Sequence, residues 1–220
     1  MDHYSAICKS HPTSLPETFN FGRDVVDNMA RNMDKIALIS CNDRNAERVF
    51  TFQDIADSSN QVANWLVEQG VSRGDRIIVM LPRIPEWQIC LTACLKLGAV
   101  PIPCITMLTE KDIAFRIDHS GAAAVITTDA ETTKFQTYLP TLKAGLAIGG
   151  AVAGWTDYGL ISDQNKRFEC CDLGLEEPAI MYYTSGSTGD PKGVCHPARS
   201  LYTWRYSAAV SYTHLRAHET

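Results

Sequence analysis

Segments of helical and strand periodicity alternate along this chain, and this alternation restricts its fold more than any other feature. Thr51 can cap a helix together with Asp54, three residues further on. Apolar residues then recur at helical spacing until Gly70, namely Ile55, Val62, Ala63, Leu66 and Val67. Ile77 to Leu81 is a continuous apolar run, which is typical of a strand buried on both faces.

The same alternation continues downstream. A helix is predicted over residues 86–97, with Trp87, Leu91 and Leu95 in the core, and it would end at Gly98. The remaining predicted elements are an extended segment at 100–103, a helix opened by a second capping box at Thr109 to Asp112, a strand at 123–127, a weaker helix at 129–138, and a strand and turn within 144–156. This order predicts an α/β fold, with a mostly parallel sheet, flanking helices and right-handed crossovers. The last strand of that sheet would be residues 179–183.

A loop rich in glycine and hydroxyl groups follows that strand, since Tyr183 to Val194 read YTSGSTGDPKGV. Its glycines let consecutive backbone N–H groups point into one concavity. Hydroxyl donors and a lysine charge surround that concavity, so the loop is suited to hold a polyphosphate at the carboxyl end of the sheet. The candidate ligand-binding residues are Thr184, Ser185, Gly186, Ser187, Thr188, Gly189, Lys192 and His196; Lys192 is also the catalytic candidate and Thr188 a candidate Mg²⁺ ligand.

Two other interpretations of this loop are weaker. A solvated Ser/Thr/Gly linker would fit TSGSTG, but not the apolar lead-in or the DPKG segment that follows. A Walker A loop needs four residues between its glycines and Ser or Thr directly after the lysine. Here two residues separate Gly186 from Gly189, and Gly193 follows Lys192, so a P-loop kinase or GTPase is disfavoured.

YTSGSTGDPKGV resembles the phosphate-binding signature of the adenylate-forming, or AMP-binding, enzymes, which include acyl-CoA synthetases, peptide-synthetase adenylation domains and luciferases. His196 falls where that family often has a histidine. Residues 20–27 (NFGRDVVD), 73–76 (RGDR) and 81–98 are also similar to the family, so the resemblance covers about residues 16–207. The segment PIPCITMLTEKDIAFRI, at 101–117, is similar to the medium-chain acyl-CoA synthetase branch.

The resemblance implies a reaction in which a small carboxylic acid, medium-chain or related, attacks ATP to give an acyl-adenylate, after which coenzyme A displaces AMP. ATP, Mg²⁺ and coenzyme A are the implied cofactors and co-substrates. Lys192 and the loop N–H groups would neutralise the β- and γ-phosphates. Two alternatives stay open: an acyl-AMP ligase or adenylation domain that loads a carrier protein, and a non-catalytic nucleotide-binding module.

The resemblance also predicts three segments: an N-terminal extension at 1–18, a partial AMP-binding domain at 19–210 that ends just after the phosphate loop, and a tail at 211–220. Ser211 to Thr220 (SYTHLRAHET) departs from the family pattern and resembles a translated sequencing adaptor, so we expect it to be an artefact. The family's adenine and acyl pockets and its C-terminal catalytic lysine have no counterpart here. We therefore expect the N-terminal part of an acyl-CoA ligase, truncated and inactive alone.

Composition predicts the partners and the compartment. The formal net charge is −5 and no basic run is present, which argues against nucleic acid as a partner. The eight cysteines show no disulfide or metal spacing, and Cys90 and Cys94 are expected to be buried free thiols. Residues 1–17 show no targeting pattern, and the uncharged run at 144–156 is too short to span a bilayer. A cytoplasmic enzyme without a membrane span is therefore predicted.

Several polar residues have an ordinary structural interpretation. His119 is expected to cap a helix or to be solvated, and Asp190 to face outward. Arg83 and Glu86 are expected to pair with each other, as exposed neighbouring charges do. His196 is predicted to contact substrate or phosphate, with a surface histidine as the alternative.

Overall fold

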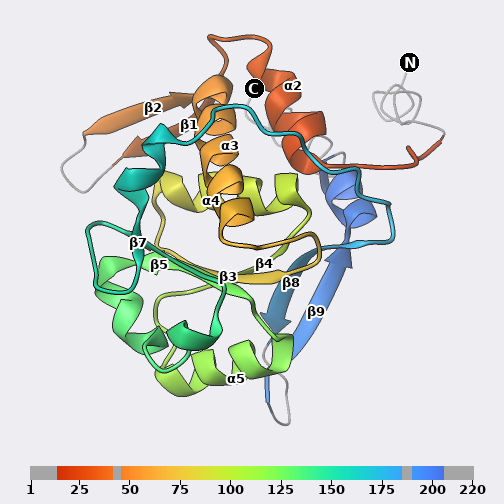
Figure 1. The fold of residues 1–220 in the computed structure, drawn as a ribbon. Coiled ribbons are helices and arrows are strands. Elements are labelled where there is room, and N and C mark those ends of the chain that lie inside the picture. Colours follow the sequence, from red (N-terminus) through yellow and green to blue (C-terminus); the bar gives the residue numbers. More distant parts are fainter. Residues whose placement is uncertain (1–13, 42–45, 185–189, 206–220) are drawn as a thin grey trace, which may run out of the picture.

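The computed structural model describes residues 14–41, 46–184 and 190–205. Its centre is a five-stranded sheet in which all neighbouring strands are parallel, in the order β4-β3-β5-β6-β7 (Figure 1). The strands are β3 (Arg76–Met80), β4 (Val100–Cys104), β5 (Ala124–Thr128), β6 (Ala144–Ile148) and β7 (Thr156–Asp157). The predicted parallel α/β sheet is therefore confirmed.

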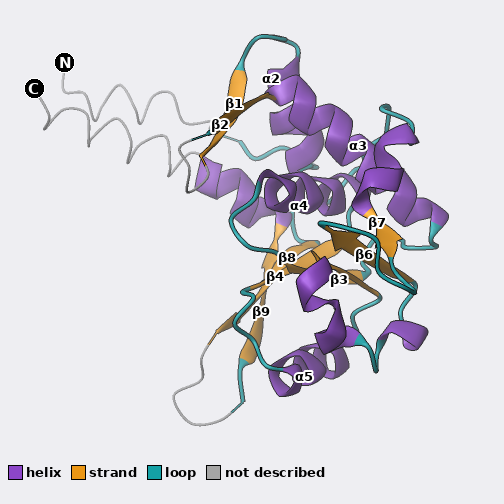
Figure 2. Cartoon of the chain, turned by 90° about the vertical axis from the view of Figure 1, so that its left-hand side faces the viewer, coloured by secondary structure: helices purple, strands orange, loops and turns teal. Residues whose placement is uncertain are grey.

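Helices cover both faces of this sheet, as predicted (Figure 2). α3 and α4 pack on one face, whereas α5 and the 3₁₀ helix η2 pack on the other. Their bounds are α3 (Phe52–Glu68), α4 (Pro85–Leu97), α5 (Glu110–Ser120) and η2 (Asp129–Phe135). The apolar stripe predicted for α3 is buried except at Val67, which is 48% exposed. The weak helix predicted at 129–138 is instead a 3₁₀ helix over its first part.

The residues of β3 alternate between the two cores. Ile77 and Val79 enter the core beneath α3 and α4, whereas Ile78 and Met80 enter the core beside α5. Successive side chains of a strand point to opposite faces, and helices cover both faces here. The continuous apolar run in the sequence is the consequence of this double burial.

The helix ends follow the residues that predicted them. Thr51 accepts the N–H of Asp54, while the Asp54 carboxylate accepts the N–H of Thr51. Thr109 and Asp112 repeat this capping box at the start of α5. α4 ends at Gly98, whose φ of 75° lies in the left-handed region that favours glycine.

Shorter elements complete the described chain. β1 (Ile36–Cys41) and β2 (Glu47–Thr51) form an antiparallel hairpin, which the periodicity did not predict. The remaining elements are the π-helical turn η1 (Gly22–Asp27), α2 (Asn28–Ala30), η3 (Leu139–Thr141), η4 (Tyr158–Asp163) and helical residues 198–205. Among the described residues, every helix is too short or too polar to cross a membrane.

The strand that leads into the predicted phosphate loop does not belong to the parallel sheet. β8 (Pro178–Thr184) pairs antiparallel with β9 (Lys192–Pro197) in a separate two-stranded sheet. The prediction of a last parallel strand is therefore wrong. The segment between β8 and β9 is shorter than the dozen or more residues that a parallel crossover needs, so β9 runs antiparallel to β8. Figure 1 shows this hairpin at one edge of the molecule, with β8 beside β4.

A buried polar cluster joins the N-terminal segment to the end of α4. Lys96 is fully buried, and its Nζ lies 2.6 Å from Asp27 Oδ1 and 2.5 Å from Asn60 Oδ1. The Asn20 amide donates to the carbonyl oxygens of Leu95 and Lys96, at 2.9 and 3.1 Å. The cluster thus gives the buried ammonium group an ion pair and hydrogen-bond acceptors, and it gives two carbonyl groups at the end of α4 a hydrogen-bond donor. These contacts hold the segment around η1 against α4.

Two arginines, Arg73 in the turn before β3 and Arg76 at the first position of β3, hold other parts of the chain in place. Arg73 donates two hydrogen bonds to the carboxylate of Glu177, just before β8. Arg76 donates from Nε to the carbonyl of Ser120, at 2.7 Å, and from Nη2 to that of Gly121, at 2.9 Å. The turn before β3 therefore holds the segment that leads into the hairpin, and the first residue of β3 holds the end of α5.

Candidate functional site

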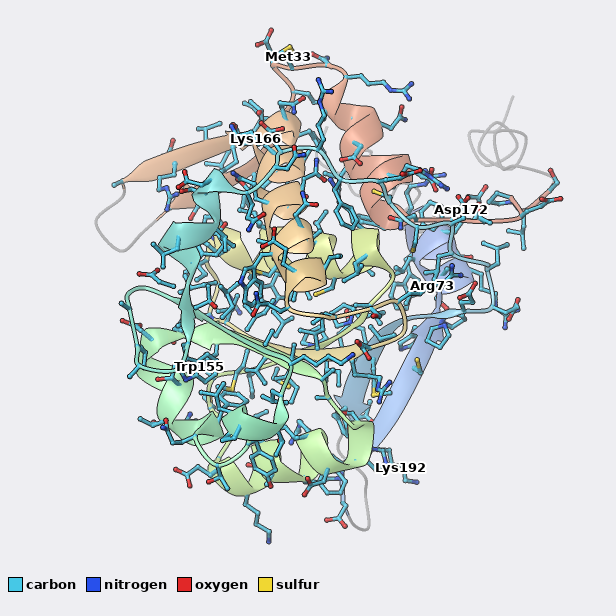
Figure 3. All side chains as sticks on the ribbon, in the orientation of Figure 1. Met33, Arg73, Trp155, Lys166, Asp172 and Lys192 are labelled. Carbon is cyan, nitrogen blue, oxygen red and sulfur yellow. The ribbon has the colours of Figure 1, made fainter. Side chains whose placement is uncertain are left out.

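The end of the β8–β9 hairpin carries two residues of the predicted phosphate loop. Thr184 and Lys192 are Cα partners across the hairpin. Because side chains alternate along a strand, Thr184, Lys192 and Tyr182 lie on one face, and Tyr183 lies on the other. The Lys192 side chain is exposed and makes no hydrogen bond or ion pair with the residues that the structure describes (Figure 3). Its ammonium group is therefore open to a ligand.

The central residues of the predicted loop lie outside the described part of the chain. These are Ser185, Gly186, Ser187, Thr188 and Gly189, and the tail at 211–220 lies outside it as well. Their predicted roles stay predictions. Asp190, the first described residue after this gap, is exposed, as expected from the sequence.

His196 lies away from the hairpin end. It lies four positions along the extended strand from Lys192, a span of about 13 Å. Its ring meets Tyr182, with ring centroids 5.8 Å apart, and Trp204, with centroids 4.9 Å apart. The structure thus brings Thr184 and Lys192 together, and it places His196 in an aromatic cluster with Tyr182 and Trp204.

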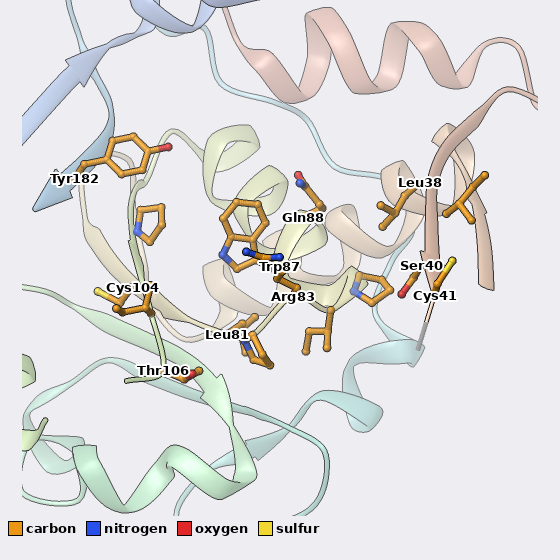
Figure 4. Close-up of a pocket in the computed structure, with 16 residues that line it drawn as sticks. Leu38, Ser40, Cys41, Leu81, Arg83, Trp87, Gln88, Cys104, Thr106 and Tyr182 are labelled. Atoms are coloured by element: carbon orange, nitrogen blue, oxygen red, sulfur yellow. The ribbon is translucent and has the colours of Figure 1, made fainter. Parts of the chain in front are cut away.

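An apolar cavity of about 740 Å³ lies beside the hairpin, at the carboxyl ends of β3 and β4 (Figure 4). Its lining comes from separate elements: Leu38 and Ser40 from β1, Leu81 and Pro82 after β3, Ile105 and Thr106 after β4, and Tyr182 from β8. Tyr182 and Thr184 share a face and are separated by about 7 Å of strand. The ligand position expected for a parallel α/β sheet therefore adjoins the hairpin face that carries Lys192.

Two expectations near this cavity are corrected. Trp87, predicted to lie in the core, packs against the core beneath α3 and α4 but is partly exposed; it lies in the first turn of α4 and also lines the cavity with Gln88. Glu86 meets Arg48 of β2 at 4.0 Å, and no pair with Arg83 is present among the described residues. Arg83 is exposed and is the charged side chain in the cavity lining.

The opposite face of the hairpin packs on α5. The Tyr183 hydroxyl lies 2.8 Å from Nδ1 of His119, so His119 has a specific partner and is not simply a cap or a solvated residue. The Arg116 guanidinium carbon lies 5.1 Å from the centre of the Tyr183 ring, and the Phe115 ring meets that ring edge-on. Helical spacing puts Phe115, Arg116 and His119 on one face of α5, but the sequence alone did not identify the hairpin as the neighbour of that face.

The cysteines in the described chain are free. Cys90 and Cys94 are buried in α4, as predicted, and burial raises the pKa of the Cys94 thiol to about 12. These thiols therefore stay protonated near neutral pH and act as apolar side chains.

Potential metal ligands do not cluster in the described residues. No group of three or more His, Cys, Asp or Glu side chains there is arranged to hold a metal ion. Thr188, the candidate Mg²⁺ ligand, lies outside that part of the chain.

Comparison with known proteins decides the family. The model of the AMP-binding enzyme family matches residues 25–219. The chain belongs to the AMP-binding enzyme family. The resemblance drawn from the phosphate-loop motif is confirmed, and the match includes both the parallel sheet and the β8–β9 hairpin.

Curated relatives within the family are acyl-coenzyme A synthetases. The chain is 32% identical over 213 residues to the mitochondrial acyl-coenzyme A synthetase ACSM4 of Mus musculus, covering 91% of this chain and 37% of that protein. It is 33% identical over 198 residues to the mitochondrial acyl-coenzyme A synthetase ACSM5 of Homo sapiens, covering 84% of this chain and 34% of that protein. The chain therefore spans little more than a third of the length of these relatives.

Solved structures agree with this membership. An acyl-CoA synthetase of Brucella canis superposes with a TM-score of 0.79 at 25% identity, over 91% of this chain and 39% of that one. The anthranilate CoA ligase AuaEII, in complex with anthranoyl-AMP, superposes with a TM-score of 0.72 at 25% identity, over 84% of this chain and 36% of that one. The predicted fold, part of an AMP-binding α/β domain, is confirmed.

The cytoplasmic prediction is contradicted. The curated relatives from mouse and human are mitochondrial acyl-coenzyme A synthetases. The prediction rested on the lack of a recognisable targeting pattern in residues 1–17, and a missing pattern does not assign a compartment.

Proposed function

We propose that this chain carries the phosphate-binding part of an acyl-CoA synthetase, an acid–thiol ligase that joins a small carboxylic acid to coenzyme A. The family match carries the proposal, together with the opposed positions of Thr184 and Lys192 at the end of the hairpin. ATP would be the nucleotide substrate and coenzyme A the thiol substrate. The acid would be a medium-chain or related carboxylate.

The proposed reaction has two steps. A carboxylate oxygen attacks the α-phosphorus of ATP, and the bond from that phosphorus to the bridging oxygen breaks, so that pyrophosphate leaves with the electron pair. The sulfur of coenzyme A then attacks the acyl carbon, AMP leaves, and the thiol proton passes to solvent. A carboxylic acid is already ionised near neutral pH, so the first step needs no general base.

The obstacle in the first step is electrostatic, because an anion must approach a polyanion. Lys192 supplies a mobile positive charge and Thr184 a hydroxyl donor on the same face of the hairpin. We assign to them the neutralisation of the β- and γ-phosphates and the positioning of the leaving pyrophosphate in line with the attack. His196 is proposed to act further along this face, beside Tyr182.

The cavity next to the hairpin supports a substrate with a hydrocarbon part. Leucine, isoleucine, proline and tryptophan side chains dominate its lining, and Arg83 supplies a charge at its edge. Apolar surface of this kind is stabilised by the burial of alkyl or aryl groups, whereas a free phosphate would lose its hydration there.

Mg²⁺ would accompany ATP in this reaction and neutralise part of its phosphate charge. The described residues do not fit a resident metal site, because they include no group of three potential ligands. The described side chains contribute charge and hydrogen bonds through Lys192 and Thr184.

An ATP–pyrophosphate exchange assay on the full-length protein tests the proposal. Hexanoate, octanoate, decanoate and benzoate would be supplied in turn, and label transfer from pyrophosphate to ATP would be measured. We expect exchange that depends on the carboxylate. ATP binding without exchange for any carboxylate would instead indicate the non-catalytic nucleotide-binding module and would overturn the proposal.

The choice of acceptor separates the ligase from its catalytic alternative. With a carboxylate that supports exchange, AMP release would be compared after addition of coenzyme A or of a phosphopantetheinylated carrier protein. Release with coenzyme A is expected. Release with the carrier protein only would assign the chain to an acyl-AMP ligase or adenylation domain.

A further inference from the structure

The β8–β9 hairpin depends on neighbouring elements for its position. It has only two strands, and an isolated two-stranded hairpin is marginally stable in water. Met181 and Tyr183 of β8 pack against the core beside α5, which fixes one face of the hairpin. The other face carries Thr184 and Lys192. Contacts on the α5 side therefore act together with the packing of β8 beside β4 to set the position of the ligand-facing side chains.

His119 makes the directional contact on the α5 side. Its Nδ1 lies 2.8 Å from the Tyr183 hydroxyl, and its ring stacks on Phe115 with centroids 5.4 Å apart. Across the hairpin, a Cβ on Gly193 would lie 3.4 Å from Cε1 of His119. His119 thus contacts β8 and lies close to β9, at the register pair Tyr183 and Gly193 that adjoins the pair Thr184 and Lys192.

Arg116 and Phe115 limit the movement of the tyrosine ring. Arg116 is buried, its Nη1 donates to the carbonyl of Asp112 at 2.8 Å, and its guanidinium lies over the Tyr183 ring. The Phe115 ring meets the same ring at a centroid distance of 6.1 Å. With the ring held in this way, its hydroxyl lies within hydrogen-bond distance of Nδ1 of His119, next to Ser120 at the end of α5.

We propose that His119 is a positioning residue for the phosphate site, acting through Tyr183 to hold the hairpin end that presents Thr184 and Lys192. The inference rests on the proposed function, since it concerns the geometry of that same site. Burial raises the pKa of Tyr183, so its hydroxyl keeps the proton near neutral pH and can donate it in a hydrogen bond to an unprotonated Nδ1. His119 does not contact the nucleotide in this proposal.

Substitutions that delete only the hydrogen bond test the role. His119→Phe keeps the ring stacking and removes the ring nitrogen, and Tyr183→Phe removes the hydroxyl group. In the full-length protein we expect each to raise the dissociation constant for ATP, and the KM for ATP in pyrophosphate exchange, by about threefold to tenfold, as the loss of one hydrogen bond would. The double variant should equal either single variant, because both remove the same bond.

Two further variants separate positioning from general stability. His119→Asn retains an acceptor near the Nδ1 position and should recover most of the ATP affinity. Tyr138→Phe removes a hydroxyl from another partly buried tyrosine packed on the same core, and it should leave ATP binding unchanged. Urea midpoints of all variants, measured in parallel, should fall by no more than the loss of one hydrogen bond allows, so that every variant stays folded in the binding assay.

The outcomes distinguish this inference from the proposed function. ATP affinities of His119→Phe and Tyr183→Phe equal to that of the wild type overturn the inference alone, as do additive effects in the double variant. If the wild type shows no carboxylate-dependent exchange, the proposed function is overturned, while the ATP affinities of the variants still decide the positioning role. A wild-type protein that binds no ATP overturns both.

Discussion

One lysine of this chain, Lys96, is buried beneath the helical layer, whereas another, Lys192, stands at the exposed end of the β8–β9 hairpin. The Lys96 ammonium group has a carboxylate, an amide oxygen and the carbonyl oxygen of Ala56 within 3.3 Å. Lys192 has no hydrogen bond or ion pair with the described residues. The two residues are of the same type, so the difference between their ammonium groups comes from their surroundings.

The difference shows what two segments that resemble the family, NFGRDVVD and the phosphate-loop motif, contribute to the protein. Around Lys96, Asn20 and Asp27 belong to the NFGRDVVD segment, and their polar groups are occupied inside the protein. That segment therefore stabilises the fold. At the hairpin end, the polar groups of Thr184 and Lys192 face outward, so this part of the signature is available for a ligand.

Removal of the buried ammonium group should have the largest effect. Lys96→Met leaves the Asp27 carboxylate and the Asn60 amide oxygen without their partner, and we expect the free energy of unfolding to fall by about 3–5 kcal/mol. Urea unfolding at neutral pH would measure it. The control is Lys143→Met, which breaks the exposed pair with Asp75 and should cost about 1 kcal/mol or less. Equal losses would contradict the comparison.

Lys192→Ala should have the opposite effect: it should impair the reaction and leave the stability almost unchanged. We expect pyrophosphate exchange by the full-length protein to slow by about 10²-fold or more, because a preorganised charge at the leaving group is lost. The unfolding free energy should change by less than about 0.5 kcal/mol, since the side chain is exposed. Lys166→Ala is the matched control: it removes an exposed lysine near the opposite end of the molecule (Figure 3) and should leave exchange unchanged. An unchanged exchange rate for Lys192→Ala would remove Lys192 from the site.

The two regions should also differ in their tolerance of a methyl group. A Cβ on Gly22 would lie 2.2 Å from Cγ of Lys96, so Gly22→Ala must displace the buried side chain and should lower the unfolding free energy by about 2 kcal/mol. A Cβ on Gly193 would meet its nearest neighbours at 3.4 Å, and Gly193→Ala should cost less than about 1 kcal/mol. Thermal unfolding of both variants would rank them, and a larger loss for Gly193→Ala would reverse the comparison.

The smallest effect concerns pH and the cap of α3. Hydrogen bonds from the N–H and hydroxyl of Thr51 hold the pKa of Asp54 below its ordinary value. The ionised carboxylate therefore contributes stability that is present above about pH 4, the ordinary aspartate value, and is lost as the pH falls through the lowered folded-state pKa. Asp54→Asn should destabilise the protein slightly at pH 7 and flatten the loss of stability between pH 5 and pH 2. Urea midpoints across that range would detect it, and parallel pH curves would contradict it.

Local patterns were enough to predict most of the scaffold. Thr51 and Thr109 begin helices because each has an acidic partner three residues on, and Gly98 ends one because glycine tolerates positive φ. The phosphate-loop motif was sufficient to identify the family. The patterns did not predict the role of β8, because its apolar run is compatible with either a parallel strand or half of a hairpin.

The sequence by itself determined the layered parallel α/β sheet, its helix boundaries and the membership in the AMP-binding family, because caps, periodicity and motifs depend on residues close together in the chain. Only the tertiary structure decided that β8 pairs antiparallel with β9, that Lys96 is buried beside Asp27, and that His119 is hydrogen-bonded to Tyr183. The side chains of these last two pairs are 69 and 64 positions apart. No local pattern selects such partners, because the packing of α4 on η1 and of α5 on the hairpin brings them together.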